Sequence, residues 1–250
     1  MTPTGLERHG NVSLLTLARG KVNAIDEATV DHLRERVSAL ERDPDTRSVV
    51  LTGVGRFFSF GFDVPALYDY PPADFTRFLI KFTRLLRALY ELPKPLVAAV
   101  NGHAVAGGFM LATTADRRIM ASGKAKISLN EITFGAALFA GSIEMLRAVV
   151  DDRRAETFAL GGAMYGAEDA RAMGLVDEVA APDAVVPRAL EIASDMAARD
   201  QAAYGAIKRL LRAPILERID RAEPASIARF VEIWYSPDTR ERLKAIRIRE

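Results

Sequence analysis

The strongest constraint on the fold is a regular alternation of short apolar runs with segments of helical spacing over the first 130 residues. Apolar runs at residues 12–17, 48–52 and 96–100 are typical of strands, and the continuous run at 48–52 is typical of a strand covered on both faces. Residues 26–42 and 73–91 instead place apolar side chains at helical spacing. This alternation predicts a mostly parallel sheet with right-handed crossover connections.

The pattern changes after about Ser142, where the strand signal fades and the chain becomes nearly all helical. Glycines and prolines interrupt this part, at Gly161, Gly162, Gly174, Pro182, Pro214 and Pro237. We therefore expect an α/β core followed by a helical tail. The end of the tail is rich in large apolar side chains, which we expect a neighbouring subunit to cover: Phe230, Ile233, Trp234 and Tyr235.

Composition excludes several classes of function. The chain has 34 Lys+Arg and 33 Asp+Glu, a net charge of +1, which argues against a dedicated nucleic-acid binder. It has no Cys, which rules out disulfide scaffolds, cysteine nucleophiles and thiolate metal sites and fits a reducing cytosol. Its three His are dispersed, so we expect no metal site.

Neither the first ten residues nor the most apolar stretch of the sequence indicates a membrane or secreted protein. Residues 1–10 are polar and contain an acid, so they do not resemble a secretion signal. Residues 95–115 are apolar, but Asn101, Gly102 and His103 interrupt them, which indicates a buried strand, a tight loop and a buried helix. We expect a cytoplasmic protein that does not enter the membrane.

Two glycine-containing loops each follow an apolar strand, at residues 58–63 (FSFGFD) and 101–108 (NGHAVAGG). Loops that follow neighbouring parallel strands meet at the same edge of the sheet, where ligands bind. Gly107 and Gly108 precede a helical run, so free backbone N–H groups should lie there and favour a negative charge. One N–H from each loop would make an oxyanion hole.

Glu131 is the candidate for acid–base chemistry. Its neighbours are apolar, and residues 132–143 contain no charge. A carboxylate in such surroundings has a raised pKa, which suits a general base or acid near neutral pH. The alternative is a structural glutamate held in an ion pair.

At this point the residues match a family. The chain resembles the crotonase superfamily, the enoyl-CoA hydratases and isomerases, over nearly its whole length. Each matching segment is weak alone, but they occur together and in order: 21–25 (KVNAI), 50–53 (VLTG), 58–63 (FSFGFD), 92–95 (LPKP), 99–102 (AVNG), Gly107-Gly108, 116–119 (DRRI), Asn130-Glu131 with Gly135, and 167–177 (AEDARAMGLVD).

The resemblance implies a spiral β-superhelix of ββα units at residues 1–190, with the acyl-CoA site, and a helical trimerisation region at 191–250. It implies an acyl-CoA thioester substrate, no cofactor besides the CoA of the substrate, and a homotrimer or a dimer of trimers. By position, the oxyanion hole would be the backbone N–H groups of Phe62 and Gly107, with Glu131 as the catalytic carboxylate.

The resemblance also implies residues that bind the substrate. Ala24 and the segment near Asp63 would line the path of the CoA, and Lys21 and Arg249 would contact its phosphates. The other positions expected at the substrate lie in the two glycine loops or form an apolar acyl pocket: Phe60, Gly61, Gly108, Phe134, Leu138 and Phe139. Aromatic clusters are also common in plain protein cores, so this pocket has a structural alternative.

Two departures from the hydratase pattern favour an isomerase. Similar hydratases hold a water between two glutamates, but Met110 occupies the position of the first, and a methionine cannot orient or deprotonate water. Phe139 stands where hydratases have a glycine beside that water. A single base in a dry pocket suits a Δ3-Δ2-enoyl-CoA isomerase. The alternatives are an enoyl-CoA hydratase, with Asp69 or Glu144 as the second acid, and a non-catalytic acyl-CoA-binding paralogue.

Overall fold

The computed structural model describes residues 2–246, and its larger sheet has six strands in the order β1-β2-β3-β5-β7-β9. β1 pairs antiparallel with β2, and the later neighbours pair in parallel. The parallel sheet predicted from the sequence is therefore confirmed. The bounds of these strands are β1 Thr4–His9, β2 Val12–Leu17, β3 Ser48–Gly53, β5 Leu96–Val100, β7 Arg117–Ala121 and β9 Glu178–Ala180.

A smaller parallel sheet has the order β4-β6-β8, with β4 at Phe57–Ser59, β6 at His103–Val105 and β8 at Ile127–Ser128. Each of its strands directly follows a strand of the larger sheet, so β3 leads to β4, β5 to β6 and β7 to β8. The chain therefore adds one strand to each sheet before a helix carries it to the next turn. This arrangement is the expected spiral of ββα units.

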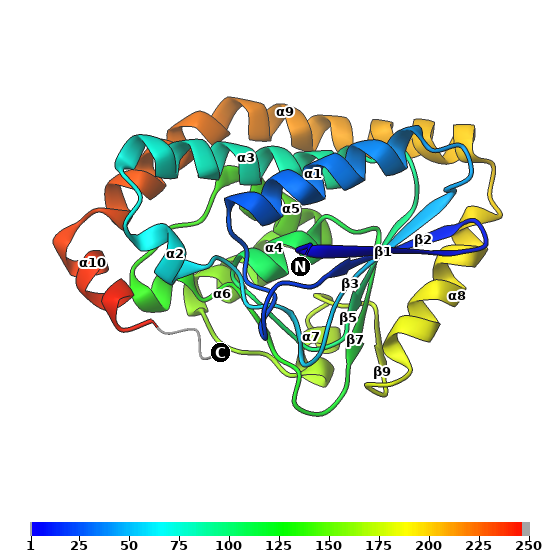
Figure 1. Ribbon diagram of the computed structural model, residues 1–250, viewed down its shortest axis with the longest axis horizontal. Coiled ribbons are helices and arrows are strands. Elements are labelled where there is room, and N and C mark those ends of the chain that lie inside the picture. Colours follow the sequence, from blue (N-terminus) through cyan, green and yellow to red (C-terminus); the bar gives the residue numbers. More distant parts are fainter. Residues whose placement is uncertain (1, 247–250) are drawn as a thin grey trace.

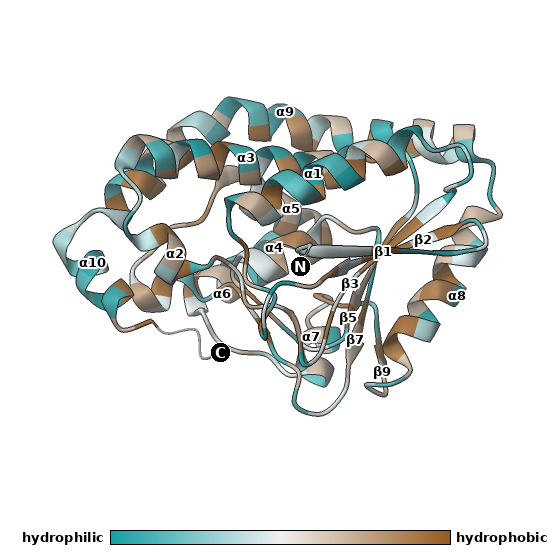
Figure 2. Ribbon diagram, in the orientation of Figure 1, coloured by the Kyte–Doolittle hydropathy of each residue, from teal (hydrophilic) through white to brown (hydrophobic). Residues whose placement is uncertain are grey.

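Helices fill the rest of the described chain. Their bounds are α1 Glu27–Arg42, α2 Val64–Tyr68, α3 Pro72–Glu91, α4 Gly107–Thr113, the 3-10 helix η1 Glu131–Phe134, α5 Ala140–Val149, α6 Asp152–Gly161, α7 Ala167–Ala172, α8 Val185–Ala197, α9 Gln201–Trp234 and α10 Pro237–Lys244. α8 and α4 lie on opposite sides of the larger sheet (Figure 1). The strands between them are largely apolar (Figure 2), as expected of a sheet covered on both faces.

The start of α1 illustrates how local sequence determines an element. Asp26 caps the helix, because its carboxylate accepts the backbone N–H of Thr29 at 2.8 Å. Val30, Leu33 and Val37 then lie on one face of the helix and are buried. The helix ends at Arg42, before Asp43 and Pro44, as the sequence predicts.

The tail differs from expectation at its prolines. α9 runs without interruption through Pro214 and Pro224, although we expected Pro214 to end a helix. α9 packs along α3 and α5 of the same chain (Figure 1), and these contacts hold the helix together where a proline removes one backbone hydrogen bond. The boundary expected after residue 190 falls inside α8, which packs on the larger sheet, and the division into domains stays a prediction.

The aromatic end of α9 is covered by its own chain. Phe230 and Trp234 are each 1% exposed. Trp234 stacks on Phe75 of α3 with ring centroids 4.5 Å apart, and Phe230 stacks on Phe139 at 4.6 Å. The expectation that these side chains need a neighbouring subunit is therefore wrong for Phe230 and Trp234, because spacing along a helix does not reveal which surface covers its apolar face.

No helix within residues 2–246 combines the length and the apolar character needed to cross a membrane. The apolar residues 95–115 instead contain β5, the short strand β6 and the whole of α4, with Asn101 and Gly102 in the turn between the two strands. The strand, loop and helix predicted for this stretch are therefore confirmed, with β6 as an addition.

Candidate active site

A cavity of about 390 Å³ lies where the two glycine loops, η1 and the end of α9 meet. Its walls are mostly apolar, and the residues that line it are Phe60, Phe62, Val64, Val105, Ala106, Asn130, Glu131, Thr133, Phe134, Phe230, Trp234 and Ile246. Glu131, Phe60, Phe62 and Phe134, which the sequence analysis singled out, are thus brought together. A largely apolar cavity with a few polar groups is the usual form of a small-molecule site.

Glu131 is the ionisable residue of this cavity wall. It begins η1, is 4% exposed, and its Oε2 has no hydrogen-bond partner within residues 2–246. Burial raises the pKa of Glu131 to about 8, because the charged form loses its hydration and gains no cation in return. The carboxyl group therefore takes up and releases protons near neutral pH, as the uncharged sequence around it predicts.

The loop that carries Phe62 is fixed by backbone bonds to residue 25. Ile25 donates its N–H to the carbonyl of Gly61 at 2.8 Å, and its own carbonyl accepts the N–H of Asp63 at 2.9 Å. The N–H of Phe62 itself donates to no backbone or side-chain acceptor in the described chain. It is therefore available to an oxygen atom from a ligand.

The second loop supplies the N–H of Gly107, the first residue of α4. This group also lacks an acceptor within residues 2–246, as expected for the first turn of a helix. The two loops are in close contact at Gly61, which has φ +88°, and a Cβ there would lie 3.1 Å from the nitrogen of Gly107. Two free donors on touching loops are the arrangement that an oxyanion hole requires.

Ala106, just before Gly107, has an unusual backbone. Its φ of 52° and ψ of −127° lie in a region that residues with a Cβ rarely adopt. Such a conformation costs about 1–3 kcal/mol and persists where the surroundings enforce it. Here the neighbouring bonds do so, because Ala106 donates its N–H to Ser128 at 2.9 Å and accepts that of Met110 at 3.0 Å.

Two residues expected at the substrate have packing roles in the structure. A Cβ at Gly108 would lie 2.2 Å from the carbonyl oxygen of Ser59, so a glycine is required there for α4 to approach β4. Phe139 is fully buried behind Phe230 and does not appear among the described residues that line the cavity. It supports the aromatic wall from behind. The contact of either residue with substrate stays a prediction.

Lys21, Ala24 and Asp63, which are expected along the CoA path, are not among the described residues that line the cavity. Lys21 is exposed, and Ala24 is buried. Asp63 caps α2 and forms an ion pair with Arg19 at 2.7 Å. Arg19 also pairs with Asp26 at 2.9 Å and so joins the start of α1 to the loop of Phe62. The sequence analysis missed Arg19, because its partners lie 7 and 44 positions farther along the chain.

One residue of the expected CoA path, Arg249, lies outside the described residues. We therefore describe no contact for it, and its role as a phosphate ligand stays a prediction.

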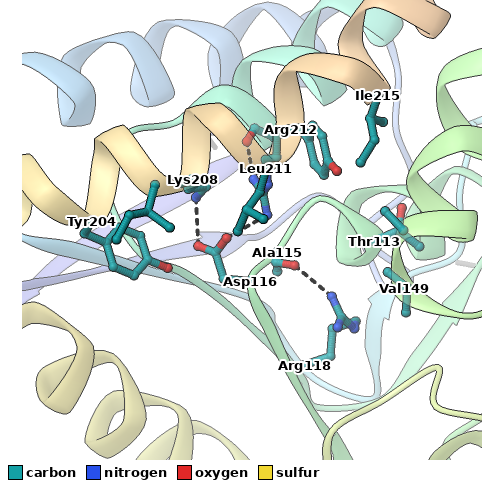
Figure 3. A pocket seen from close by; sticks show the side chains of 13 residues that line it. Thr113, Ala115, Asp116, Arg118, Val149, Tyr204, Lys208, Leu211, Arg212 and Ile215 are labelled. Atoms are coloured by element: carbon teal, nitrogen blue, oxygen red, sulfur yellow. Dashed lines mark hydrogen bonds and ion pairs between the residues drawn. The ribbon is translucent and has the colours of Figure 1, made fainter.

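A second cavity, of about 490 Å³, lies between α9 and the larger sheet (Figure 3). Its polar groups bind one another. Asp116 accepts hydrogen bonds from Lys208 at 2.7 Å, from Arg212 at 2.6 Å and from the backbone N–H of Leu96 at 2.7 Å. Burial lowers the pKa of Lys208 to about 8, although Asp116 opposes the shift. This cluster fastens α9 to β5 and leaves no unpaired carboxylate for chemistry.

Within residues 2–246, no three His, Asp or Glu side chains lie close enough to hold a metal ion. The aromatic cavity with Glu131 is therefore the candidate active site.

Comparison with known proteins identifies the family. The model of the family described as "Enoyl-CoA hydratase/isomerase" matches residues 7–245, nearly the whole chain. The chain belongs to the enoyl-CoA hydratase/isomerase family. The match covers both glycine loops and Glu131 and extends through the helical tail.

Curated relatives and solved structures of this family cover almost all of the chain. A carnitinyl-CoA dehydratase from Citrobacter koseri is 31% identical, over 94% of this chain and 91% of its own. A Mycobacterium tuberculosis protein has been solved twice, once described as a probable enoyl-CoA hydratase and once as an enoyl-CoA isomerase. Those structures are 31% and 30% identical, cover 90% and 92% of this chain and 93% and 98% of their own, and both have a TM-score of 0.83.

A third structure extends the likeness of fold to the ends of the chain. An enoyl-CoA hydratase/isomerase from Mycobacterium paratuberculosis has a TM-score of 0.90 and covers 98% of this chain and 99% of its own. At 24% identity it shows a shared fold and nothing finer.

In this member of the enoyl-CoA hydratase/isomerase family, no second acid lines the described cavity wall. Met110 is 1% exposed inside α4. Asp69 is exposed at the end of α2. Glu144 forms ion pairs with Arg147 at 3.2 Å and with Arg218 of α9 at 2.6 Å. Neither candidate for a second acid lines the described cavity wall.

Proposed function

We propose that this protein is a Δ3-Δ2-enoyl-CoA isomerase. The observation that carries the proposal is the isolation of Glu131, an unpaired carboxyl group in a cavity whose other described lining residues carry no ionisable side chain. A shift of a double bond moves one proton between two carbon atoms of the same substrate. It requires a single group that accepts and returns that proton, and it requires no water.

The reaction follows from this geometry. Ionised Glu131 removes a proton from C2 of a 3-enoyl-CoA, the C2–H bond breaks, and the electron pair moves onto the thioester oxygen. The N–H groups of Phe62 and Gly107 donate hydrogen bonds to that negatively charged oxygen. The thioester carbonyl then re-forms, and the electron pair between C1 and C2 moves to form the C2–C3 double bond. The C3–C4 double bond breaks, and its electron pair takes the proton from Glu131 to form the new C4–H bond. Atoms and charge balance with the enzyme restored.

The usual contributions of a general base and of an oxyanion hole can account for much of the rate acceleration that this reaction needs. A positioned base contributes about 10²–10⁴ in rate, and an oxyanion donor contributes about 2.7–4 kcal/mol of transition-state stabilisation. The apolar walls keep water from the enolate and strengthen both hydrogen bonds.

The relatives support two related reactions. The Mycobacterium tuberculosis protein is described in one case as an enoyl-CoA isomerase and in the other as a probable hydratase, and the curated relatives are named carnitinyl-CoA dehydratases. Hydration and dehydration add or remove water, which a second acid must hold. Met110, in place of that acid, favours isomerisation, and an enoyl-CoA hydratase is the second candidate.

We also propose a homotrimer or a dimer of trimers, as the family resemblance implies. Three large apolar residues of α9 are available for contact with another subunit, since Ile207, Leu210 and Leu211 are 58%, 76% and 70% exposed. Light scattering coupled to gel filtration measures the mass directly. A monomeric mass at micromolar concentration contradicts this part of the proposal.

The function is tested with two substrates on the purified protein. trans-3-Hexenoyl-CoA should yield the conjugated 2-enoyl thioester, observed by its ultraviolet absorbance, and crotonyl-CoA should not be hydrated. Hydration of crotonyl-CoA at a comparable rate would reverse the preference for an isomerase. Binding of acyl-CoA without turnover in either assay would instead indicate a non-catalytic paralogue.

A further inference from the structure

The acyl cavity has an unusual wall at the end of α9. Trp234 is 1% exposed, and Phe75 stacks on its indole with ring centroids 4.5 Å apart and an interplanar angle of 26°. Phe230 lies beside both rings, with its centroid 6.0 Å from that of Trp234 and 6.1 Å from that of Phe75. Trp234 is therefore held among aromatic rings in the wall of the cavity.

The N–H on that ring has no partner. Nε1 of Trp234 is buried and makes no hydrogen bond within residues 2–246. A buried indole N–H normally finds an acceptor. Adjacent residues do so, because the hydroxyl of Tyr235 donates to the carbonyl of Tyr70 at 2.5 Å and that of Ser236 donates to Ile233 at 2.8 Å. The unpaired donor is therefore specific to Trp234 and not a general property of the segment.

The charge of the cavity limits what this donor can bind. Its described lining includes no Lys or Arg, so a carboxylate or phosphate on the acyl chain would enter without a cation. A purely hydrocarbon chain would leave the N–H unpaired. A neutral oxygen atom accepts the hydrogen bond and brings no charge into the cavity.

We propose that Trp234 donates a hydrogen bond to a neutral oxygen on the acyl chain, which makes the preferred substrates oxygen-bearing acyl-CoA thioesters, with a hydroxyl, ether or keto group, instead of plain hydrocarbon ones. This inference rests on the proposed acyl-CoA site and adds the class of acyl group. It also gives Trp234 a role in specificity that is separate from proton transfer by Glu131.

Saturated ligands test the proposal without any turnover. Hexanoyl-CoA is compared with its 4-, 5- and 6-hydroxy derivatives by calorimetry on the whole protein. At least one hydroxy derivative should bind about 3–10-fold more tightly than hexanoyl-CoA, the usual range for one neutral hydrogen bond. The proposal is overturned if all three hydroxy derivatives bind equally or more weakly than hexanoyl-CoA. It is also overturned if a hexanoyl-CoA that bears a trimethylammonium group, which offers no acceptor, binds more tightly.

Two variants separate the N–H from the ring. Trp234→Phe keeps an aromatic wall and removes the donor, so the ratio of the affinities for the hydroxy ligand and for hexanoyl-CoA should fall to about one. Tyr235→Phe, the matched control, removes a hydroxyl that already has a partner and should keep the preference. A preference that survives in Trp234→Phe overturns the assignment.

The tryptophan also reports on its own environment, because the chain has only one. In the wild-type protein, the favoured hydroxy ligand should shift the emission of Trp234 more than hexanoyl-CoA does. Equal emission shifts with the two ligands contradict the proposal. Because this measurement uses the wild-type protein, it does not depend on whether a variant folds. The hydroxy ligands do not react, so their binding is measured independently of turnover. If the protein prefers them but does not isomerise 3-enoyl-CoA, only the proposed reaction is overturned.

Discussion

Glu131 and Asp116 are both largely buried carboxylates, yet their surroundings are opposite. Asp116, with its side chain 12% exposed, receives hydrogen bonds from Lys208, Arg212 and the backbone N–H of Leu96. Glu131, 4% exposed, has an oxygen with no partner in the described chain. The difference teaches that burial by itself does not indicate a reactive group. A paired carboxylate fastens elements together, whereas an unpaired one remains free to exchange a proton.

The two surroundings also have opposite energetic consequences. Removing one member of a buried ion pair leaves the others charged and unpaired, which is strongly destabilising. Removing an unpaired buried carboxyl relieves a desolvated group instead. Stability and activity should therefore respond in opposite ways at the two sites, and the predictions below are ordered by the size of that response.

The largest effect is expected from Glu131→Gln. The amide keeps the shape of the side chain but cannot accept the proton, so kcat for isomerisation should fall by about 10²–10⁴. The free energy of unfolding should stay constant or increase. Glu144→Gln, at a carboxylate paired outside the cavity, is the control and should keep its rate. A loss of stability in Glu131→Gln would show that the carboxyl group of Glu131 stabilises the fold, as that of Asp116 does.

Asp116→Asn should have the opposite profile. It leaves Lys208 and Arg212 without their anion, and the free energy of unfolding should fall by about 3–5 kcal/mol. Urea denaturation measures the change. Glu156→Gln removes one partner of an exposed pair with Arg153, at 3.6 Å, and should change stability by less than about 0.5 kcal/mol. At a temperature where Asp116→Asn stays folded, its isomerase rate should match that of the wild type. A large loss of rate would show that Asp116 is needed for activity as well as for stability.

The dependence of rate on pH should report Glu131. Because its pKa is raised to about 8, only a minor fraction is ionised at pH 7, and the base must be ionised to act. kcat/KM should rise about tenfold per pH unit below pH 8 and level off above it. A profile already flat between pH 6 and 8 would show that the base has an ordinary carboxyl pKa.

Stability should respond to pH with opposite signs at the two sites. Between pH 4.5 and about 8 the folded protein keeps the proton of Glu131 that the unfolded chain has released, so the free energy of unfolding falls as pH rises. Between about 8 and 10.5 the folded protein has released the proton of Lys208 that the unfolded chain keeps, so this contribution rises. In Glu131→Gln, the free energy of unfolding should no longer fall between pH 4.5 and about 8. In Lys208→Met, it should no longer rise between about 8 and 10.5. A pH dependence that persists in the variant would show that the substituted residue does not cause it.

The smallest effect concerns the backbone beside Glu131. Ala106→Gly should relieve the strained conformation and raise the free energy of unfolding by about 1 kcal/mol, after the greater freedom of glycine in the unfolded chain is allowed for. Ala104→Gly, in β6 without a positive φ, is the control and should lose stability. Equal losses in both variants would show that Ala106 is not strained.

Much of the core could be predicted from the sequence, because local patterns determine it. Apolar runs correctly predicted β2, β3 and β5, and the capping residue Asp26 correctly predicted the start of α1. The raised pKa of Glu131 followed from the uncharged residues after it, since residues that lack charge cannot pair with a carboxylate. These inferences depend only on neighbours in the chain, which the sequence displays directly.

The features that depend on distant contacts could not be predicted. The smaller sheet consists of strands of two or three residues, too short for an alternating pattern. α9 passes through two prolines because α3 and α5 pack along it. Arg19 shows no sign in the sequence that it pairs with both Asp26 and Asp63. Likewise, helical spacing marked Trp234 as apolar but did not place it in the wall of the cavity that contains Glu131.

The placement of Phe230 and Trp234 has a consequence for how such enzymes diversify. The carboxyl group proposed to move the proton lies near the middle of the chain, while these two rings of the cavity wall come from the end of a long helix near its terminus. Substitutions at the end of α9 can therefore exchange one acyl group for another while the residues around position 131 stay unchanged. A gene encoding this fold could acquire new substrates through changes in the segment that encodes α9, with its chemistry preserved upstream.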